Sequence, residues 1–113
     1  MKVTIAHKLV SSANLRSGAG GFGRSGRAQQ HRAMGRLAVA ANGPVPALPV
    51  TVTLVRVGPR ALDDDNLAYA FKAIRDGVAD ALGVKDHDTR VAWAYAQERG
   101  AYAIRIELAA RGA

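Results

Sequence analysis

The chain of 113 residues contains no cysteine and no long apolar run. Without cysteine, disulfide bonds and cysteine-ligated zinc or iron–sulfur sites are excluded, which fits the reducing interior of a cell. No apolar stretch approaches the roughly 18 residues that would span a bilayer. The first residues lack the apolar core and the cleavage site of a signal peptide. We therefore expect a cytoplasmic protein that makes no membrane contact.

Acidic residues are absent from the first 62 positions, which hold 9 of the 16 Lys and Arg residues. The rest of the chain holds the other 7 basic residues and all 9 acids, so its net charge is −2. A basic surface attracts polyanions at long range, because phosphate contacts release counterions. A nucleic acid is therefore one expected partner, and a compositional bias towards Arg, Ala and Gly is the alternative.

Two glycine-rich patterns before residue 27 resemble ligand-binding loops. Residues 21–26 satisfy G-x-G-x-x-G, but a dinucleotide site also needs a preceding strand and an acid about 20 residues later. No acid occurs before Asp63, so we predict no nucleotide cofactor. Residues 23–26 also imitate the G-x-x-G loop of RNA-binding domains. That loop joins two helices and no helix is predicted before it, so RNA binding is kept only as an alternative.

Hydropathy patterns predict six elements within a single domain over residues 1–113. Strands are expected at 2–10, 50–57, 90–97 and 102–108, and helices at 27–41 and 65–82. The last two strands should form an antiparallel hairpin around a turn at 98–101. A flexible Gly- and Arg-containing loop is predicted at about 15–26. This β-α-β-α-β-β order is typical of a two-layer α+β domain, with a small mixed sheet and two helices on one of its faces.

The helix expected over residues 65–82 shows the clearest apolar stripe. The stripe has the helical period and consists of Leu67, Phe71, Ile74, Val78 and Leu82. Asp64 is expected as the N-cap, and acids at a helix start suit the helix dipole. Gly77 lies inside the helix at a cost of up to about 1 kcal/mol, so a bend is allowed there.

Five of the nine acids lie in two short clusters, at 63–65 and 86–88. Bunched carboxylates repel one another and are costly without a cation. Asp63, Asp65 and Asp88 would offer the oxygen ligands that Mg²⁺ or Mn²⁺ prefers, and such a metal would activate water for attack on a phosphate. The three carboxylates can converge only if the chain reverses direction after the helix, or if a neighbouring subunit supplies one of them. The alternative is that one cluster caps a helix and the other lies in a turn.

Lys72 lies two helical turns after Asp65 on the same solvent-facing side, displaced by about 10 Å along the axis. Its ammonium group could offset the charge that develops on a phosphate in a transition state. A surface ion pair with Asp76, four residues later, is the alternative.

Three segments between residues 60 and 91 form a specific pattern: RALDDDNL at 60–67, KAIRD at 72–76 and GVKDHDTRV at 83–91. The pattern resembles the RusA family of Holliday junction resolvases, which have a D-x-D-N-L helix start, a Lys and an Asp along that helix, and a D-D-x-x-V segment before a strand. Ser12-Ala13-Asn14 is similar to the family's Ser/Asn segment after its first strand.

The resemblance implies a Mg²⁺-dependent endonuclease that resolves branched double-stranded DNA by paired phosphodiester cleavage. Family members are small homodimers from phages and prophages, which implies the cytoplasm of a bacterial or phage-infected cell. Asp63 and Asp65 match the two helix-start carboxylates, and Asp88 matches the later one because it lies three residues before Val91. The resemblance therefore implies that these three hold the metal, with Lys72 as the catalytic lysine.

The chain departs from the family pattern around these residues. The family lysine usually lies four residues after the second Asp, where this chain has Tyr69, and Lys72 is the nearest replacement. The gap to Asp88 is about one helical turn longer than usual, which an inserted turn before Lys72 would explain. His87 stands where the family often has the first Asp of its pair. Asn66, Tyr69 and His87 are candidates for supporting roles.

Phosphate contacts are expected from basic residues of the first half. The candidates are Arg16, Arg24, Arg27, Arg32 and Arg36, from the predicted loop and the helix after it. A disordered surface loop is the alternative for this stretch. Two alternatives to the nuclease stay open: a non-catalytic nucleic-acid-binding module of the same fold, and a small structural protein without a specific partner. The three histidines are dispersed, so no His-rich metal site is predicted.

Overall fold

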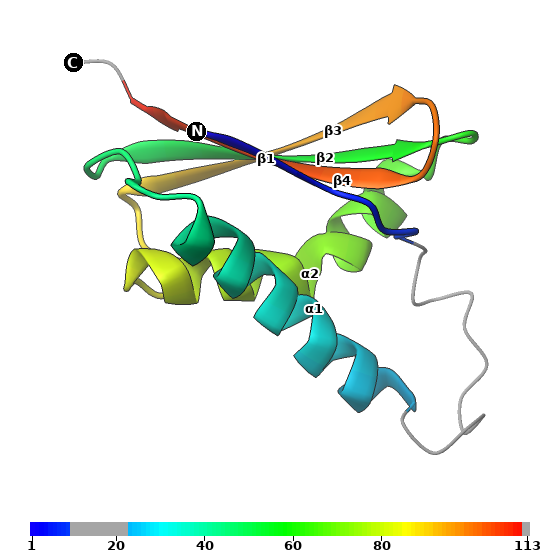
Figure 1. The fold of residues 1–113 in the computed structure, drawn as a ribbon, viewed down its shortest axis with the longest axis horizontal. Coiled ribbons are helices and arrows are strands. Elements are labelled where there is room, and N and C mark those ends of the chain that lie inside the picture. Colours follow the sequence, from blue (N-terminus) through cyan, green and yellow to red (C-terminus); the bar gives the residue numbers. More distant parts are fainter. Residues whose placement is uncertain (10–22, 112–113) are drawn as a thin grey trace.

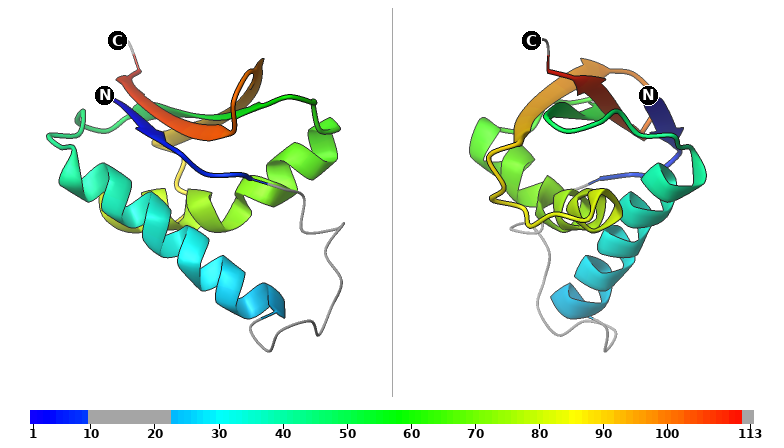
Figure 2. Two further views of the ribbon diagram at one scale, coloured as in Figure 1. Left: turned by 45° about the vertical axis from the view of Figure 1, so that its right-hand side comes forward. Right: turned by 90° about the vertical axis from the view of Figure 1, so that its left-hand side faces the viewer.

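A layer of four strands and a layer of two helices make up the computed structural model, which describes residues 1–9 and 23–111 (Figure 1). The elements are β1 (Lys2–Ile5), α1 (Gly23–Ala41), β2 (Val50–Gly58), α2 (Asp64–Leu82), β3 (Val91–Arg99) and β4 (Ala103–Ala110). Both helices cover the same face of the sheet (Figure 2). The predicted α+β class, with a mixed sheet and two helices on one face, is confirmed.

The strands lie in the order β1-β4-β2-β3. β3 is parallel to β2 from Val91 beside Val50 to Arg99 beside Gly58, whereas β4 is antiparallel to both β2 and β1. The predicted hairpin of the last two strands is wrong, because β2 lies between them. The chain after β3 crosses the end of β2, where the Gly100 amide donates to the Gly58 carbonyl over 3.1 Å. A short gap between two strands does not show which neighbours they choose, and here the crossover through α2 makes β3 the parallel partner of β2.

Three predicted boundaries also differ. Helix α1 begins at Gly23, so residues 23–26 of the predicted loop are helical; extending an existing helix costs far less than starting one. β1 ends at Ile5, the last residue that pairs with β4. The N-cap of α2 is Asp63 rather than Asp64, and its side chain makes no capping hydrogen bond. The rest of the predicted loop, at 15–22, lies outside the described residues.

The core lies between the helices and the inner face of the two central strands. Alternate residues of β2 and β4 point inwards, as the strand period of two requires: Val50, Val52, Leu54, Ile104, Ile106 and Leu108. The predicted stripe of α2 packs against them, with Leu82 only partly buried at the helix end. Within the described residues, neither helix has the length and apolar character that crossing a membrane would need.

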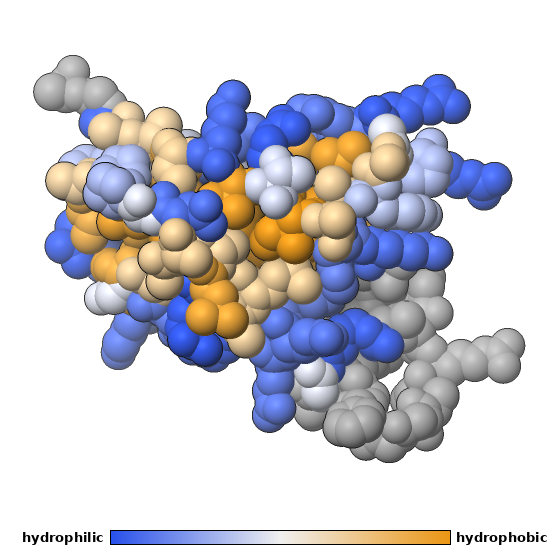
Figure 3. Space-filling model, viewed as in Figure 1, coloured by the Kyte–Doolittle hydropathy of each residue, from blue (hydrophilic) through white to orange (hydrophobic). Residues whose placement is uncertain are grey.

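Apolar side chains also gather on part of the surface. Figure 3 shows them in the middle of the face that β1 and α1 present, surrounded by hydrophilic side chains. Leu37 of α1 is 55% exposed, and Val45, in the connection after α1, is 39% exposed. This face belongs to the β1 side of the sheet, away from β3.

Two glycines allow α1 and α2 to touch through their backbones. A Cβ atom at Gly77 would lie 1.9 Å from the carbonyl oxygen of Arg32, and one at Gly35 would lie 2.4 Å from that of Ile74. Neither position has room for a side chain. The place of Gly77 in the sequence is therefore explained by close helix packing, and α2 continues through it as one helix.

Replacing Gly77 by Ala should destabilise the protein, although the same change in an ordinary helix gains about 1 kcal/mol. We expect the free energy of unfolding to fall by about 2 kcal/mol or more, because the helices must separate to admit the methyl group. Urea denaturation measures the change. Ala40→Gly, at an exposed position of α1, should cost only about 1 kcal/mol through helix propensity. A Gly77→Ala protein that matched the parent in stability would contradict the backbone contact.

Candidate functional site

The first acidic cluster lies where α2 begins, just after the end of β2. The side chains of Asp63, Asp64 and Asp65 are exposed. Within residues 1–9 and 23–111, no group donates a hydrogen bond to their carboxylates or forms an ion pair with them. The three charges repel one another, while the amino end of the helix favours negative charge. Half-buried Asn66 follows directly. This end of the helix therefore presents exposed carboxylate groups to solvent.

Two polar side chains fix the loop that leads into this cluster. The Gln97 Nε2 atom donates to the Leu62 carbonyl over 2.8 Å, and its Oε1 atom accepts from the Leu62 amide, also over 2.8 Å. Arg56, only 4% exposed, donates to the carbonyl groups of Arg60 (2.6 Å) and Leu9 (3.0 Å). Neither residue can be recognised from the sequence, because a polar residue in a strand pattern does not reveal which backbone group it contacts. The start of α2 is thus attached to the end of β3 through Gln97.

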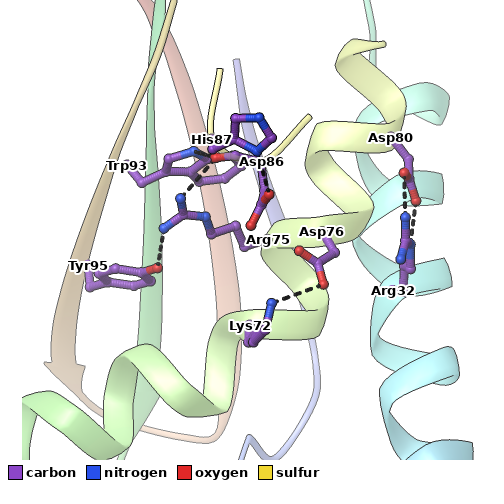
Figure 4. A network of polar contacts seen from close by, with 9 residues as sticks. All are labelled: Arg32, Lys72, Arg75, Asp76, Asp80, Asp86, His87, Trp93 and Tyr95. Carbon is purple, nitrogen blue, oxygen red and sulfur yellow. Dashed lines mark hydrogen bonds and ion pairs between the residues drawn. The ribbon is translucent and has the colours of Figure 1, made fainter. Parts of the chain in front are cut away.

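The second acidic cluster lies in the connection between α2 and β3 (Figure 4). The Asp86 carbonyl oxygen accepts hydrogen bonds from Arg75 Nη2 (2.9 Å) and from Trp93 Nε1 (3.1 Å). The Arg75 guanidinium group also lies over the Trp93 ring, 4.6 Å from its centroid, and donates to the Tyr95 hydroxyl over 3.1 Å. These contacts attach the cluster to the beginning of β3.

Asp88 is already engaged by a cation. Its carboxylate accepts hydrogen bonds from the Arg90 Nη2 (2.8 Å), Nε (3.1 Å) and backbone amide (2.9 Å). These hydrogen bonds lower the pKa of Asp88 to about 2, so its carboxylate stays ionised. A metal ion at Asp88 would have to share the carboxylate with Arg90 or displace it.

Within one chain the two clusters lie at opposite ends of β3. The parallel register places the start of β3 beside the start of β2, whereas Asp63 follows the end of β2. Nine strand residues span about 30 Å, so Asp88 is too distant to share a cation with Asp65 of its own chain. Among the described residues, no group of three or more His, Cys, Asp or Glu side chains could hold a metal. The chain does reverse after α2, but only a neighbouring subunit can bring the three acids together.

Lys72 lies on the exposed side of α2 between the two clusters. Its Nζ atom is 3.6 Å from the Asp76 carboxylate. This is the surface ion pair that the sequence offers as the alternative to a role at a phosphate. Tyr69, one turn earlier, is 50% exposed. The His87 side chain is 80% exposed, with its Nδ1 atom 3.6 Å from the Asp86 carboxylate. None of these contacts is deeply buried, so each side chain can turn towards a bound phosphate.

A shallow hollow lies beside Lys72, between α1, α2 and the second cluster (Figure 4). It is lined by Arg32, Lys72, Lys85, Asp76, Asp80 and Asp86. Three cationic and three anionic side chains oppose one another there. The hollow therefore has no excess charge that would select a metal ion or a phosphate.

Arg32 connects the two helices. Its Nε and Nη2 atoms donate to the two Asp80 carboxylate oxygens over 2.6 and 2.8 Å. These hydrogen bonds hold the pKa of Asp80 below its ordinary value. Arg32 was predicted to contact DNA. In the structure its ion pair with Asp80 joins α1 to α2.

Three of the other arginines predicted to contact DNA lie on α1. Arg36 is exposed and Arg27 is half-buried on α1, and neither forms an ion pair with another described residue. Arg24 lies within α1, but only its backbone is described. Arg16 and the Ser12-Ala13-Asn14 segment lie outside the described residues.

His7 and His31 are in contact although 24 residues separate them. Their Nε2 atoms are 3.1 Å apart and the rings meet edge to face. One ring must donate and the other accept, so at least one imidazole is neutral. Burial lowers the pKa of both, and the charges of His7 and Arg27 lower the pKa of His31 further. Dispersed positions in the sequence hide this pair, which forms only when α1 crosses the sheet.

No protein-family model and no curated protein matches this chain.

The His7–His31 contact makes stability depend on pH. The folded pKa values lie below the unfolded value of 6.5, so the unfolded chain binds protons that the folded protein excludes, and stability falls as the pH drops through 6.5. We expect the urea midpoint to decrease between pH 7.5 and 5.5. His31→Gln should flatten this dependence, whereas His87→Gln should leave it unchanged. A slope that His31→Gln does not alter would contradict the neutral pair.

Proposed function

We propose that this protein is a Mg²⁺-dependent, structure-selective endonuclease that resolves four-way DNA junctions as a symmetric dimer. The observation that carries the proposal is the D-x-D-N-L helix start, whose carboxylates are exposed and have no partner among the described residues. Carboxylates that only capped a helix would be expected to bond to its free amides, and Asp63 makes no such bond.

Asp63 and Asp65 are suited to a hard divalent cation. Mg²⁺ takes one or two protein carboxylates and keeps several waters, and these side chains would give up no hydrogen bond or ion pair with the described residues when they bind it. When bound, the metal would polarise a phosphodiester and make its bound water a better nucleophile. Mn²⁺ prefers the same oxygen ligands. Exposure at the helix start leaves space for both the waters and a DNA strand.

Lys72 and Asp88 would complete the site. The exposed Lys72–Asp76 pair contributes only about 0.5 kcal/mol, so Lys72 can exchange Asp76 for a phosphate at little cost. Asp88 is ionised and fixed in position by Arg90. It would enter from the second subunit, because its own chain holds it at the other end of β3.

The charge of the protein suits a DNA substrate. The net charge is +7, and no acid precedes Asp63. Arg27 and Arg36 of α1, with Arg16 and Arg24 before them, would contact the sugar-phosphate backbone, which positions a protein on DNA without reading sequence. Junction resolution needs two symmetric nicks, and a two-fold dimer presents two equivalent sites.

A non-catalytic nucleic-acid-binding module is the second candidate. It is favoured by the engagement of two proposed catalytic residues, Asp88 by Arg90 and Lys72 by Asp76. Such a module would bind branched DNA with the same dependence on salt. It would differ from the nuclease in producing no Mg²⁺-dependent cleavage.

A nicking assay on a synthetic four-way junction tests the nuclease directly. The parent should cut with Mg²⁺ and be inactive in EDTA, and Asp65→Asn should lower the rate on the order of 100-fold or more through loss of a metal ligand. Asp64→Asn removes the same charge from the neighbouring residue, which occupies the variable position of the D-x-D-N-L motif, and should keep most of the activity. Junction binding should survive in both variants. Cleavage by Asp65→Asn at the parental rate would contradict the metal role.

Binding should weaken steeply with salt, because phosphate contacts release counterions. Arg36→Gln should weaken junction binding for all sequences and reduce the slope of log K against log[salt] by about 1. Fluorescence anisotropy with a labelled junction at several salt concentrations measures this slope. Binding that does not respond to salt would contradict both nucleic-acid candidates.

A further inference from the structure

His7 and His31 bring two imidazole nitrogens together away from both acidic clusters. His7 follows the end of β1 by two residues and is half-buried, whereas His31 lies on α1 and is only 7% exposed. Their Nε2 atoms are 3.1 Å apart. The proposed nuclease uses neither side chain, so this contact needs an explanation of its own.

The geometry of the pair fits a metal ion bound by both rings. Two metal–nitrogen bonds of about 2.1 Å that meet at roughly 95–110° place their nitrogens about 3.1–3.4 Å apart. The two Nε2 atoms are already at the lower end of this range, and tetrahedral Zn²⁺ would need them to separate by only about 0.3 Å. The ring centroids are 5.1 Å apart, farther than the nitrogens, so both Nε2 atoms lie on the facing sides of the rings. Each can therefore direct a lone pair at one ion between them.

The chemistry of the pair selects the class of ion. Imidazole nitrogen suits Zn²⁺, Cu²⁺ and Ni²⁺, whereas Mg²⁺ prefers oxygen ligands and Mn²⁺ binds nitrogen most weakly of the first-row ions. The Arg27 side chain is close enough for its charge to lower the pKa of His31. A neighbouring positive charge opposes any cation that is held mainly by electrostatic attraction. The pair is therefore suited to an ion that bonds strongly to nitrogen, and not to the Mg²⁺ of the proposed nuclease.

We infer that His7 and His31 form a two-histidine binding site for a divalent late transition-metal ion, Zn²⁺ or Cu²⁺. Over residues 1–9 and 23–111 no third His, Cys, Asp or Glu joins them, so water would fill the remaining positions of the metal. In the neutral pair one Nε2 atom carries the hydrogen that the other accepts. On metal binding this hydrogen moves to Nδ1 of the same ring, and both imidazoles stay neutral. The site does not depend on the proposed function.

Folding is needed to assemble this site. The two histidines are 24 residues apart in the sequence and meet only when α1 lies against the end of β1. The unfolded chain does not hold the two nitrogens together. A ligand that binds the folded state in preference to the unfolded one stabilises it by mass action. Metal binding should therefore appear as a gain in stability that increases with the concentration of the ion.

Urea denaturation of the full chain with increasing Zn²⁺ tests the site. Excess Mg²⁺ is present throughout, so that the carboxylates of the acidic clusters are already occupied. The urea midpoint of the parent should rise with Zn²⁺ and return when the Zn²⁺ is chelated. His7→Gln should lose this rise, whereas His87→Gln, which removes an exposed imidazole, should keep it. Each variant is compared with itself without Zn²⁺, so any stability lost through the substitution cancels.

Copper provides a spectroscopic measurement of the same site. The electron paramagnetic resonance spectrum of the parent with Cu²⁺ should show coupling to two imidazole nitrogens, and His7→Gln should retain coupling to one at most. The affinity for Cu²⁺ should fall at least about tenfold in His7→Gln, because even the loss of an outer-shell partner costs about 10–100-fold. Arg27→Gln should have the opposite effect and tighten binding, since it removes a positive charge near the ion.

Two results would overturn the site. A parent whose urea midpoint does not respond to Zn²⁺ would leave the two histidines as a hydrogen-bonded pair only. A response that survives His7→Gln would place the metal elsewhere on the protein.

Discussion

The parallel pairing of β2 with β3 is the constraint on which every functional argument depends. α2 connects the end of β2 to the start of β3. Because these strands are parallel, the two ends of α2 lie at opposite ends of the sheet. The motif that suggests a nuclease places carboxylates at both of these ends. The proposed metal site therefore requires carboxylates from two copies of the chain.

Polar contacts attach both acidic clusters to β3. Gln97 attaches one acidic cluster to the strand, and Trp93 with Arg75 attaches the other. Each cluster is thus fixed to the same strand, which holds the two clusters about 30 Å apart. Sites built on strands hold their geometry better than sites built on loops alone. The same hydrogen bonds explain why this edge strand carries Trp93 near its start and Gln97 near its end.

Local periodicity predicted much of this structure, and non-local choices account for what it missed. The stripe of α2 and the alternation along β3 depend on residues a few positions apart, so the sequence shows them directly. The false hairpin arose because spacing alone cannot show that β2 inserts between β3 and β4. The sequence shows Gly77 only as a residue that weakens the helix, because the contact with the backbone of α1 that requires a glycine is non-local. The acidic residues of the proposed site were chosen by type and spacing, and their separation in space follows only from the strand order.

The most direct test of the shared site is a crystal structure of the protein soaked with Mn²⁺, whose anomalous scattering locates the metal. Two equivalent metal peaks are expected in the dimer, each within about 2.2 Å of carboxylate oxygens. Each peak should be bound by Asp63 or Asp65 of one subunit and by Asp88 of the other. A metal whose protein ligands all come from one chain would contradict the shared site.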